Sequence, residues 1–473
     1  MAAAFTFDRV SAENLADPYP LYRRLREEQP VYYSEAFGVW VVSRYDDVRQ
    51  VLMDPTRFSS AFQIRTPHAP AAGVLEILAE GHPEVPALLN EDPPAHRRTR
   101  ALVAKTFSAR RIAGLQPRVA AIVTELLDAM QPRGEADLIA ELATPLPLRV
   151  ICELIGLPTG DALRIRAWTG QLALLTSFGA SPEEQRAAAR ESVDFERYLA
   201  AAVADRRAAG RDDLLTDLIR VRADGAAPLT DVEIISLLIS LVFAGHETTA
   251  NLIAGALVLL LHRPDLWAAA GDNPDLVAAV VEETLRIDAP VQGMFRRAVF
   301  DVQVSGVTIP AGAQVFALFA AVNRDGAVFD RPDEFDPGRP DKDRHLAFGR
   351  GIHFCPGAAL APNGGAGRAV HAPRTAAGAA PRSRLPRPVR AQPHAPRPPH
   401  SPRHLVTAPV QAAAMARTAR AGEGARQAAA MARRARAVSS RHSRTVRRQP
   451  AGMSVAARKL SVRMRVSGSS SCG

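Results

Sequence analysis

The sequence predicts a mainly α-helical protein with small β-sheets, and three observations support this fold class. Apolar residues recur at helical spacing in many segments, and one long segment that begins near residue 230 is almost wholly apolar. Alternating apolar and β-branched residues occur only in two short regions, at 30–42 and at about 298–320. No linker rich in Pro, Gly or Ser divides residues 1–361, so we expect a single large domain there.

The elements follow in chain order. The amphipathic segment 17–25 precedes a predicted hairpin at 30–42, with Phe37 and Gly38 at its turn. The hydrophobic period predicts helices near 45–53, 93–105, 112–130, 162–177, 183–208 and 212–223. In the second β region, Gly306 and the segment 310–312 mark turns.

The longest predicted helix starts at a capping box. Thr230 and Glu233 have the spacing in which each side chain bonds the other residue's backbone N–H, and an apolar run continues to Leu261. A helix this apolar is expected to be buried nearly all round. Within it, residues 244–249 read AGHETT, a polar island that costs stability unless its groups find partners or a function. In the simpler interpretation, Thr248 bonds the carbonyl four residues back and the charged pair reaches solvent.

The most informative segment is FGRGIHFCPG, residues 348–357. Its glycines allow a tight turn and a close approach of the backbone to a flat cofactor. Cys355 in such a loop, with its sulfur among backbone N–H groups, suits an iron-bound thiolate. A buried free cysteine in a glycine-rich turn is the alternative interpretation, and the full F-G-x-G-x-H-x-C-x-G spacing argues against it.

This spacing resembles the haem loop of the cytochrome P-450 (haem-thiolate monooxygenase) family, and AGHETT resembles that family's oxygen-activation motif. The resemblance covers residues 15–361 and implies the family fold, truncated after the cysteine loop. It implies haem b ligated through Cys355 and positioned by Phe348 and Gly349. Thr248 would hydrogen-bond dioxygen and Glu247 would relay protons, so that one oxygen atom enters a small apolar substrate.

Two further sets of residues match the family. Glu283 and Arg286, at E-x-x-R spacing on one helix face, would form a buried structural ion network with Arg339. The haem propionates would be held by four residues, His96, Arg100, Arg296 and His353. The substrate pocket would be lined by the 60–90 loop and by residues that include Phe243, Ala244, Val291 and Met294.

The resemblance also implies partners. Electrons would come from NAD(P)H through ferredoxin reductase and ferredoxin, and a basic patch of Arg97, Arg98, Lys105, Arg110 and Arg111 would either dock an acidic ferredoxin or be a solvated face. The three cysteines have no paired spacing, which favours a reducing compartment. The N-terminus shows no secretory signal pattern. A cytoplasmic protein without membrane association is expected.

Residues 362–473 differ sharply from the rest. They hold 22 of the 59 basic residues, one of the 49 acidic residues and no aromatic residue, so their net charge is +21 while residues 1–361 carry −11. Such a segment is expected to be disordered. One interpretation is a basic arm that binds nucleic acid. It has no aromatic side chains for base stacking and no repeat, which makes a nucleic-acid partner the weaker hypothesis.

The stronger hypothesis is translation out of frame. The family's cysteine loop continues into a helix that reads L-A-R-x-E, whereas here Leu360-Ala361 is followed by Pro-Asn-Gly-Gly. Codons for the residues from 362 onward, read one base later, permit R-M-E-A-R-V-A-L-F-T-R-L-A-R-L-P-G-L-R-L. That reading restores the motif and an amphipathic helix. With residues 362–473 as they stand, the chain would be either an active monooxygenase or an unstable, inactive pseudoenzyme.

Overall fold

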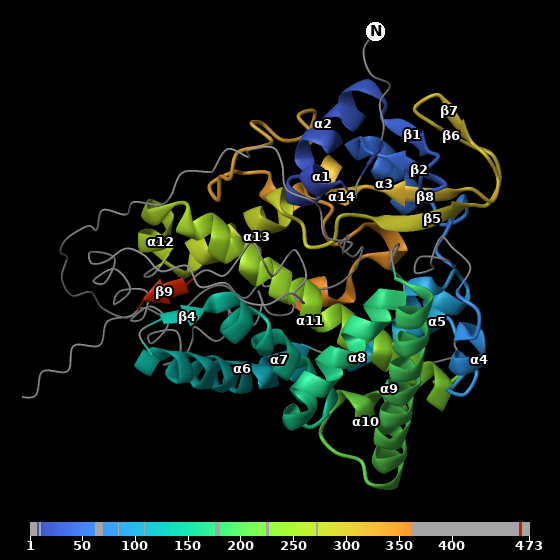
Figure 1. The fold of residues 1–473 in the computed structure, drawn as a ribbon, viewed down its shortest axis with the longest axis vertical. Helices are drawn as coiled ribbons and strands as arrows, with labels where there is room; N and C mark the ends of the chain where they lie inside the picture. The colour runs from blue at the N-terminus through green and yellow to red at the C-terminus, as the bar shows by residue number, and fades with distance from the viewer. Residues whose placement is uncertain are drawn as a thin grey trace, which may run out of the picture.

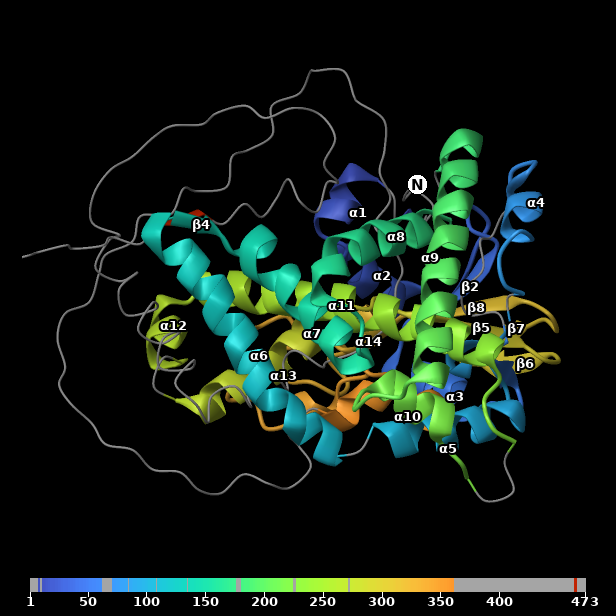
Figure 2. The same cartoon turned by 90° about the horizontal axis from the view of Figure 1, so that it is seen from below.

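The structure is a computed structural model that describes residues 7–8, 11–61, 70–83, 85–107, 109–133, 135–175, 180–223, 227–270, 273–360 and 463–465. It is mainly helical with small sheets, as predicted. Helix α11, Asp231–Leu261, crosses the middle of the molecule (Figures 1 and 2). The larger sheet lies on one side of it, and helices α6 to α10 lie on the other.

The sheet side is built from both ends of the described domain. Its strands run in the order β1-β2-β8-β5-β3, with β2 and β8 parallel and the other neighbours antiparallel. The strands are β1 Val31–Ser34, β2 Val39–Val42, β3 Phe58–Ser59, β5 Met294–Ala298 and β8 Gln314–Ala317. A separate hairpin joins β6 Val302–Val304 to β7 Val307–Ile309. The predicted turn at Phe37-Gly38 is confirmed, and Gly38 has a φ of 63°, a left-handed conformation that favours glycine.

The helices match the predicted periods closely and add several that the period did not reveal. The helices outside α11 are α1 Ala12–Ala16, α2 Tyr19–Glu28, α3 Tyr45–Met53, α4 Val74–Leu78, α5 Ala95–Thr106, α6 Ala109–Met130, α7 Pro145–Ile155, α8 Ala162–Leu175, α9 Pro182–Ala208, α10 Leu214–Arg220, α12 Pro264–Ala270, α13 Pro274–Ile287 and α14 Phe319–Val322. Helix α7 was not predicted. Its two prolines stand in the first turn, where a missing N–H costs no helical hydrogen bond.

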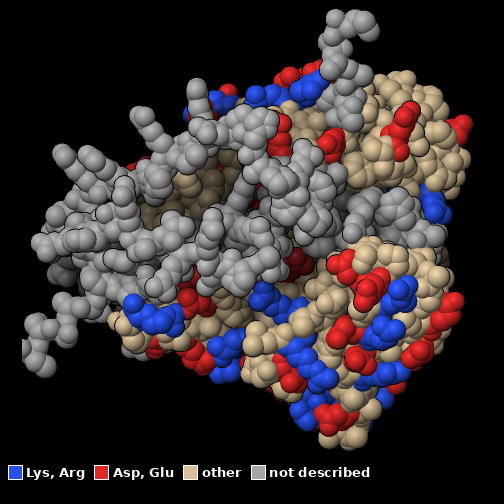
Figure 3. Space-filling model, in the orientation of Figure 1, with Lys and Arg blue, Asp and Glu red and all other residues tan. Residues whose placement is uncertain are grey.

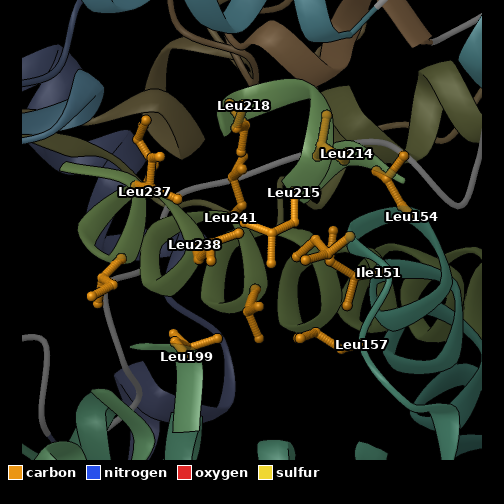
Figure 4. Packing of buried hydrophobic residues seen from close by; sticks show 14 of the residues in the cluster. Ile151, Leu154, Leu157, Leu199, Leu214, Leu215, Leu218, Leu237, Leu238 and Leu241 are labelled. Carbon is orange, nitrogen blue, oxygen red and sulfur yellow. The ribbon is translucent and has the colours of Figure 1, made fainter. Parts of the chain in front are cut away.

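Helix α11 begins at the predicted capping box. The Glu233 backbone N–H donates to Thr230 Oγ1 at 3.3 Å, and the Thr230 N–H donates to the Glu233 carboxylate at 2.8 Å. Its first half packs in the largest apolar core. There Leu237, Leu238 and Leu241 meet side chains from α7, α9 and α10 (Figure 4).

The second half of α11 is less buried than predicted. Leu252 and Leu260 are buried, but the residues between them, which include Ile253 and Leu257, are only half-buried. By length and composition α11 could cross a membrane, yet 61% of its most apolar window is buried within the protein. It is therefore described better as a core helix whose last three turns lack part of their covering.

The sequence predicts disorder for residues 362–473, which follow the cysteine loop. Most of 362–473 lies outside the described residues. The exception is strand β9, Arg463–Arg465, which pairs antiparallel with β4, Glu135–Asp137. For the rest of this segment the expectation of disorder stays a prediction. The register of β9 sets Arg465 opposite Glu135 and Arg463 opposite Asp137.

Candidate active site

The cysteine loop closes on itself through backbone hydrogen bonds. The Cys355 N–H donates to the Phe348 carbonyl at 3.0 Å, and the Gly349 N–H donates to the Leu346 carbonyl at 2.9 Å. Glycine is required at position 351 for two reasons. Its φ is 73°, and a Cβ there would lie 2.5 Å from the backbone oxygen of Leu52 at the end of α3. The loop is thus held against α3 at a separation that no side chain at 351 would permit.

The sulfur of Cys355 lies in an environment suited to a bound cation. Burial raises the pKa of the Cys355 thiol to about 11, while hydrogen bonds from the backbone N–H groups of Gly357 and Ala358 and the charge of Arg100 oppose the rise. These groups would stabilise a thiolate once a metal ion supplied the missing positive charge, because a coordinated thiol loses its proton. The donor set therefore fits a metal-ligating cysteine.

Above this sulfur lies a cavity of about 1070 Å³, including the part that opens to solvent. Its wall is formed by the cysteine loop, α11, β5 and the segments around Leu88 and Pro290. Of the predicted site residues, those on the wall are Ala244, Thr248, Val291, Met294, Arg296, Phe348, Gly349, His353 and Cys355.

The wall residues of α11 form a single stripe. Ser240, Ala244 and Thr248 lie four residues apart and all line the cavity, so they share one face of the helix. Thr248 is buried, and its hydroxyl donates to the Ala244 carbonyl at 3.0 Å. This is the local bond of the simpler interpretation, yet the same hydroxyl lies on the cavity wall, so the two interpretations of Thr248 are compatible.

Phe243, which was predicted to line the pocket, is not part of the wall. It is buried against Ala173 and Leu172 of α8. Residues 243 and 244 are about 100° apart around a helix, and Ala244 is the one that faces the cavity. Of the predicted 60–90 loop, Leu88 and Leu89 reach the wall, whereas residues 62–69 and 84 lie outside the described residues.

His246 and Glu247 of α11 are not part of the cavity wall. Burial raises the pKa of the Glu247 carboxyl, and the positive charge of Arg166 on α8 opposes the rise. His246 is buried, with its Nδ1 2.7 Å from the Val242 carbonyl and its Nε2 3.3 Å from Thr169 Oγ1 on α8. A carboxyl with a raised pKa can hold a proton closer to neutral pH, which suits a relay beside Thr248.

Four residues predicted to bind propionates gather around the cysteine loop. The rings of His96 and His353 lie 4.1 Å apart between centroids, and Arg296 is almost fully buried on the cavity wall. Arg100 is half-buried, and Cys355 is close enough to affect its pKa. Burial and the charges of Arg100 and Arg296 lower the pKa of His96 to about 4.

These four groups are better suited to an anionic ligand than to one another. Burial, followed by the charge of Arg296, lowers the pKa of His353 to about 2, and burial lowers that of Arg296 to about 10. Within the described residues the Nε2 atoms of His96 and His353 are buried and have no hydrogen-bond partner. A buried nitrogen without a hydrogen-bond partner destabilises the fold by about 1–3 kcal/mol. Carboxylate groups at this place would supply both the acceptors and the negative charge, so the residues fit the propionates of a haem.

The buried ion network behind the loop has the predicted members. Arg286 meets Glu283 through two N–H donors at 2.7 and 2.8 Å, both side chains being fully buried, and Arg339 Nε lies 3.3 Å from the same carboxylate. Arg286 also donates to the carbonyl oxygens of Asn323, Pro332 and Glu334. Asn323 in turn accepts the N–H of Leu346 at 2.7 Å. The network therefore fixes the segment that enters the cysteine loop.

Two of the five residues of the basic patch are paired with carboxylates. Arg98 is paired with Glu233, and Arg111 with Asp212 and Asp217. Lys105 donates to the carbonyl of Arg222. Over α9 and α10, Figure 3 shows basic and acidic side chains interspersed. These contacts favour a solvated face over a uniformly positive docking surface.

Glu91 is a site residue that sequence reasoning missed. Its carboxylate accepts the N–H of Leu88 at 2.9 Å and the hydroxyl of Thr99 at 3.0 Å, and its carbonyl accepts a hydrogen bond from His353. It therefore joins the cavity wall, helix α5 and the cysteine loop. A nearly buried carboxylate just before Asp92-Pro-Pro carries no spacing signal, so only the fold reveals it.

Together, the helical fold, the cysteine loop and the cationic set define a haem-thiolate protein. The comparisons with known proteins agree. Residues 183–363 match the family model described as "Cytochrome P450". The chain is 42% identical over 363 residues to cytochrome P450 107B1 of Saccharopolyspora erythraea, covering 75% of this chain and 86% of that protein. It is 40% identical over 353 residues to the cytochrome P450 monooxygenase PikC of Streptomyces venezuelae, covering 73% of this chain and 80% of PikC.

Solved structures show the same likeness. Cytochrome P450 CREJ in complex with (4-ethylphenyl) dihydrogen phosphate matches with a TM-score of 0.71 and 35% identity, over 76% of this chain and 88% of that one. The haem domain of Tepidiphilus thermophilus P450 matches with a TM-score of 0.71 and 31% identity, over 75% of this chain and 86% of that one. The chain belongs to the cytochrome P450 family.

Proposed function

We propose that this protein is a monooxygenase that inserts one oxygen atom from O2 into a small, largely apolar organic substrate. The observation that carries the proposal is the cavity, which has Cys355 at one side and apolar side chains over most of its wall. Haem, when bound, supplies the reductive activation of O2 at a thiolate-ligated iron.

Each residue has a defined task in this proposal. Cys355 is the metal ligand, and the N–H groups of Gly357 and Ala358 moderate the charge on its sulfur. Arg296 and His353, with His96 and Arg100, hold the propionates. Phe348 and Gly349 form the loop surface that a flat ring would contact.

Proton delivery is assigned to two neighbours in α11. Thr248 Oγ1 lies on the wall and can turn from the Ala244 carbonyl toward the cavity. Glu247 holds a proton more readily than an exposed carboxyl, because burial raises its pKa. The cavity wall excludes water elsewhere with apolar side chains such as Val291 and Met294, so protons would arrive by this route.

The partners follow from the need for two electrons per turnover. We infer that they come from NAD(P)H through ferredoxin reductase and ferredoxin, in the cytoplasm. The pairing of Arg98 and Arg111 with carboxylates argues against a ferredoxin site on α5 and α6.

Replacement of Cys355 by Ala tests the assignment. The reduced protein with carbon monoxide should show the thiolate-type Soret shift, and Cys355→Ala should abolish it while some haem is still bound. Cys152→Ala is the matched control, because Cys152 is a buried thiol on α7 away from the cavity. A Cys355→Ala protein that keeps the thiolate spectrum would refute the proposal.

A second candidate is an inactive product of a shifted reading frame. The family match ends at residue 363, and the chain covers 80–86% of three relatives that are 40–42% identical to it. The half-buried second half of α11 also fits a missing packing partner. We infer that residues 362–473 are out of frame. Salt-dependent retention on DNA would test the weaker hypothesis of a nucleic-acid-binding tail.

A further inference from the structure

The cavity wall contains one polar side chain that the proposed chemistry does not use. Among the described wall residues, five carry polar or ionisable side-chain atoms: Ser240, Thr248, Arg296, His353 and Cys355. The last three belong to the haem site, and Thr248 bonds the Ala244 carbonyl. Ser240 remains.

Ser240 lies among apolar neighbours. Leu237 and Leu241 flank it on the same wall, and Leu88 and Leu89 belong to the cavity as well. The residue is half-buried, and within the described part of the chain no hydrogen bond joins its hydroxyl to a protein atom. A hydroxyl placed in an apolar cavity costs free energy unless a ligand bonds to it.

The separation between Ser240 and Thr248 sets the length of a ligand that contacts both residues. The two residues are eight apart on one helix, which is about 12 Å along the axis. Both face the cavity, so a ligand that extends along the α11 stripe can contact both. Cations line only the end near Cys355, where Arg296 and His353 are assigned to the propionates. A charged group beside Ser240 would therefore be desolvated without a counter-ion.

Resting on the proposed function, we propose that Ser240 determines substrate specificity by hydrogen-bonding one uncharged oxygen of the substrate. The substrate class is an otherwise apolar molecule that carries a carbonyl or hydroxyl roughly 12 Å from the carbon held near Thr248. The hydroxyl of Ser240 both donates and accepts, so it accommodates either group.

A pair of probes that differ only in this oxygen tests the proposal. The probes are trans-4-(4-propylcyclohexyl)cyclohexanone and the corresponding hydrocarbon, 4-propylbicyclohexyl. Their dissociation constants are measured by equilibrium dialysis with the haem-loaded fraction of the full chain and, in parallel, with protein from the frame-corrected gene. The variants are Ser240→Ala, Ser240→Thr, which keeps a hydroxyl, and Ser236→Ala, which removes a half-buried serine of α11 that is not on the wall.

A hydrogen bond of this kind contributes about 0.5–1.5 kcal/mol, which corresponds to about 2- to 12-fold in affinity. Ser240→Ala should weaken ketone binding by that factor and leave hydrocarbon binding unchanged or slightly tighter. Ser240→Thr should retain most of the ketone preference, and Ser236→Ala should alter neither constant.

Three results would overturn the proposal: equal loss of both probes in Ser240→Ala, no ketone preference in the unsubstituted protein, or no binding of either probe. The carbon monoxide spectrum is independent of all three. A thiolate-type spectrum in a protein without ketone preference would reject the role of Ser240 and leave the proposed function intact.

Discussion

Thr248 shows how one hydroxyl can serve both the helix and the cavity. Its bond to the Ala244 carbonyl keeps it paired while no ligand is near, and its place on the wall lets it turn inward. Thr248→Ala removes the hydroxyl with little change of volume. A positioned proton donor contributes about 10²–10⁴-fold to a rate, so in frame-corrected protein we expect the product formed per NAD(P)H to fall at least about tenfold while hydrogen peroxide rises.

Parallel measurement of NAD(P)H consumed, product and peroxide checks this prediction. Thr248→Ser is the control, because it keeps the hydroxyl and should keep most of the coupling. Unchanged coupling in Thr248→Ala would remove both Thr248 and Glu247 from the proton relay.

His246 should make the stability of the protein depend on pH. Burial and the charge of Arg166 on α8 lower its pKa below 6.5, although its bond to the Val242 carbonyl opposes the shift. Below about pH 6.5 the unfolded chain binds a proton that the folded chain does not, so the free energy of unfolding falls as the pH falls. One histidine can change the free energy of unfolding by at most about 1.4 kcal/mol per pH unit.

Urea unfolding at pH 7.5 and 5.5 would measure this dependence. His246→Gln should lose about 1 kcal/mol less stability between the two values than the unsubstituted protein. His262→Gln, at the exposed end of α11, is the control and should keep the full dependence. Identical pH profiles for His246→Gln and the unsubstituted protein would contradict the prediction.

At the scale of elements, the ion network links α13 to the segment that enters the cysteine loop. Glu283→Ala would leave Arg286 and Arg339 buried without their carboxylate, and such a loss typically costs about 3–5 kcal/mol. We expect the melting temperature and the haem content to fall together. Glu334→Ala is the control, since its exposed pair with Arg331 should contribute at most about 1 kcal/mol. Equal effects of the two substitutions would show that the buried network has no special role.

Which elements could be predicted depended on whether their signal was local. The capping box at Thr230, the hairpin turn at Gly38 and the cysteine spacing are written within ten residues of sequence each, and the structure shows these features. Helix α7, with prolines in its first turn, was not among the predicted helices. Glu91 and Ser240 were missed because their importance depends on what distant segments bring beside them.

The cavity itself shows the same limit. The sequence predicts that α11 passes the cysteine loop, but not which face of α11 it turns toward the cavity. Phe243 and Ala244 are neighbours in the chain, yet Phe243 packs against α8 and Ala244 lines the cavity. Charge gave the clearest long-range signal, since a net −11 over 1–361 beside +21 over 362–473 is difficult to reconcile with one folded unit.

At the scale of the whole molecule, the second half of α11 is incompletely covered within the described part of the chain. The last three turns of α11 expose part of Ile253 and Leu257, and Val123, Leu126 and Leu142 beside them are also only partly buried. The frame-shifted reading from codon 362 supplies an amphipathic helix that could cover such a surface. In the chain itself, Pro362 lacks an N–H and two glycines follow, each weakening a helix by about 1 kcal/mol relative to Ala.

We therefore predict that the 473-residue chain expresses poorly or binds less than one haem per protein, and that deleting one base near codon 362 restores both properties. Each large apolar side chain that the restored helix buries should contribute about 1.5–3 kcal/mol, against a total stability of about 5–15 kcal/mol. Haem content by pyridine haemochrome assay and thermal unfolding would measure the change. A stop codon after Ala361 is the control: it removes the basic segment without supplying the helix, so it should not restore haem binding. Full haem occupancy with a cooperative melt in the 473-residue chain, or full rescue by the stop codon, would show that the missing helix is not the defect.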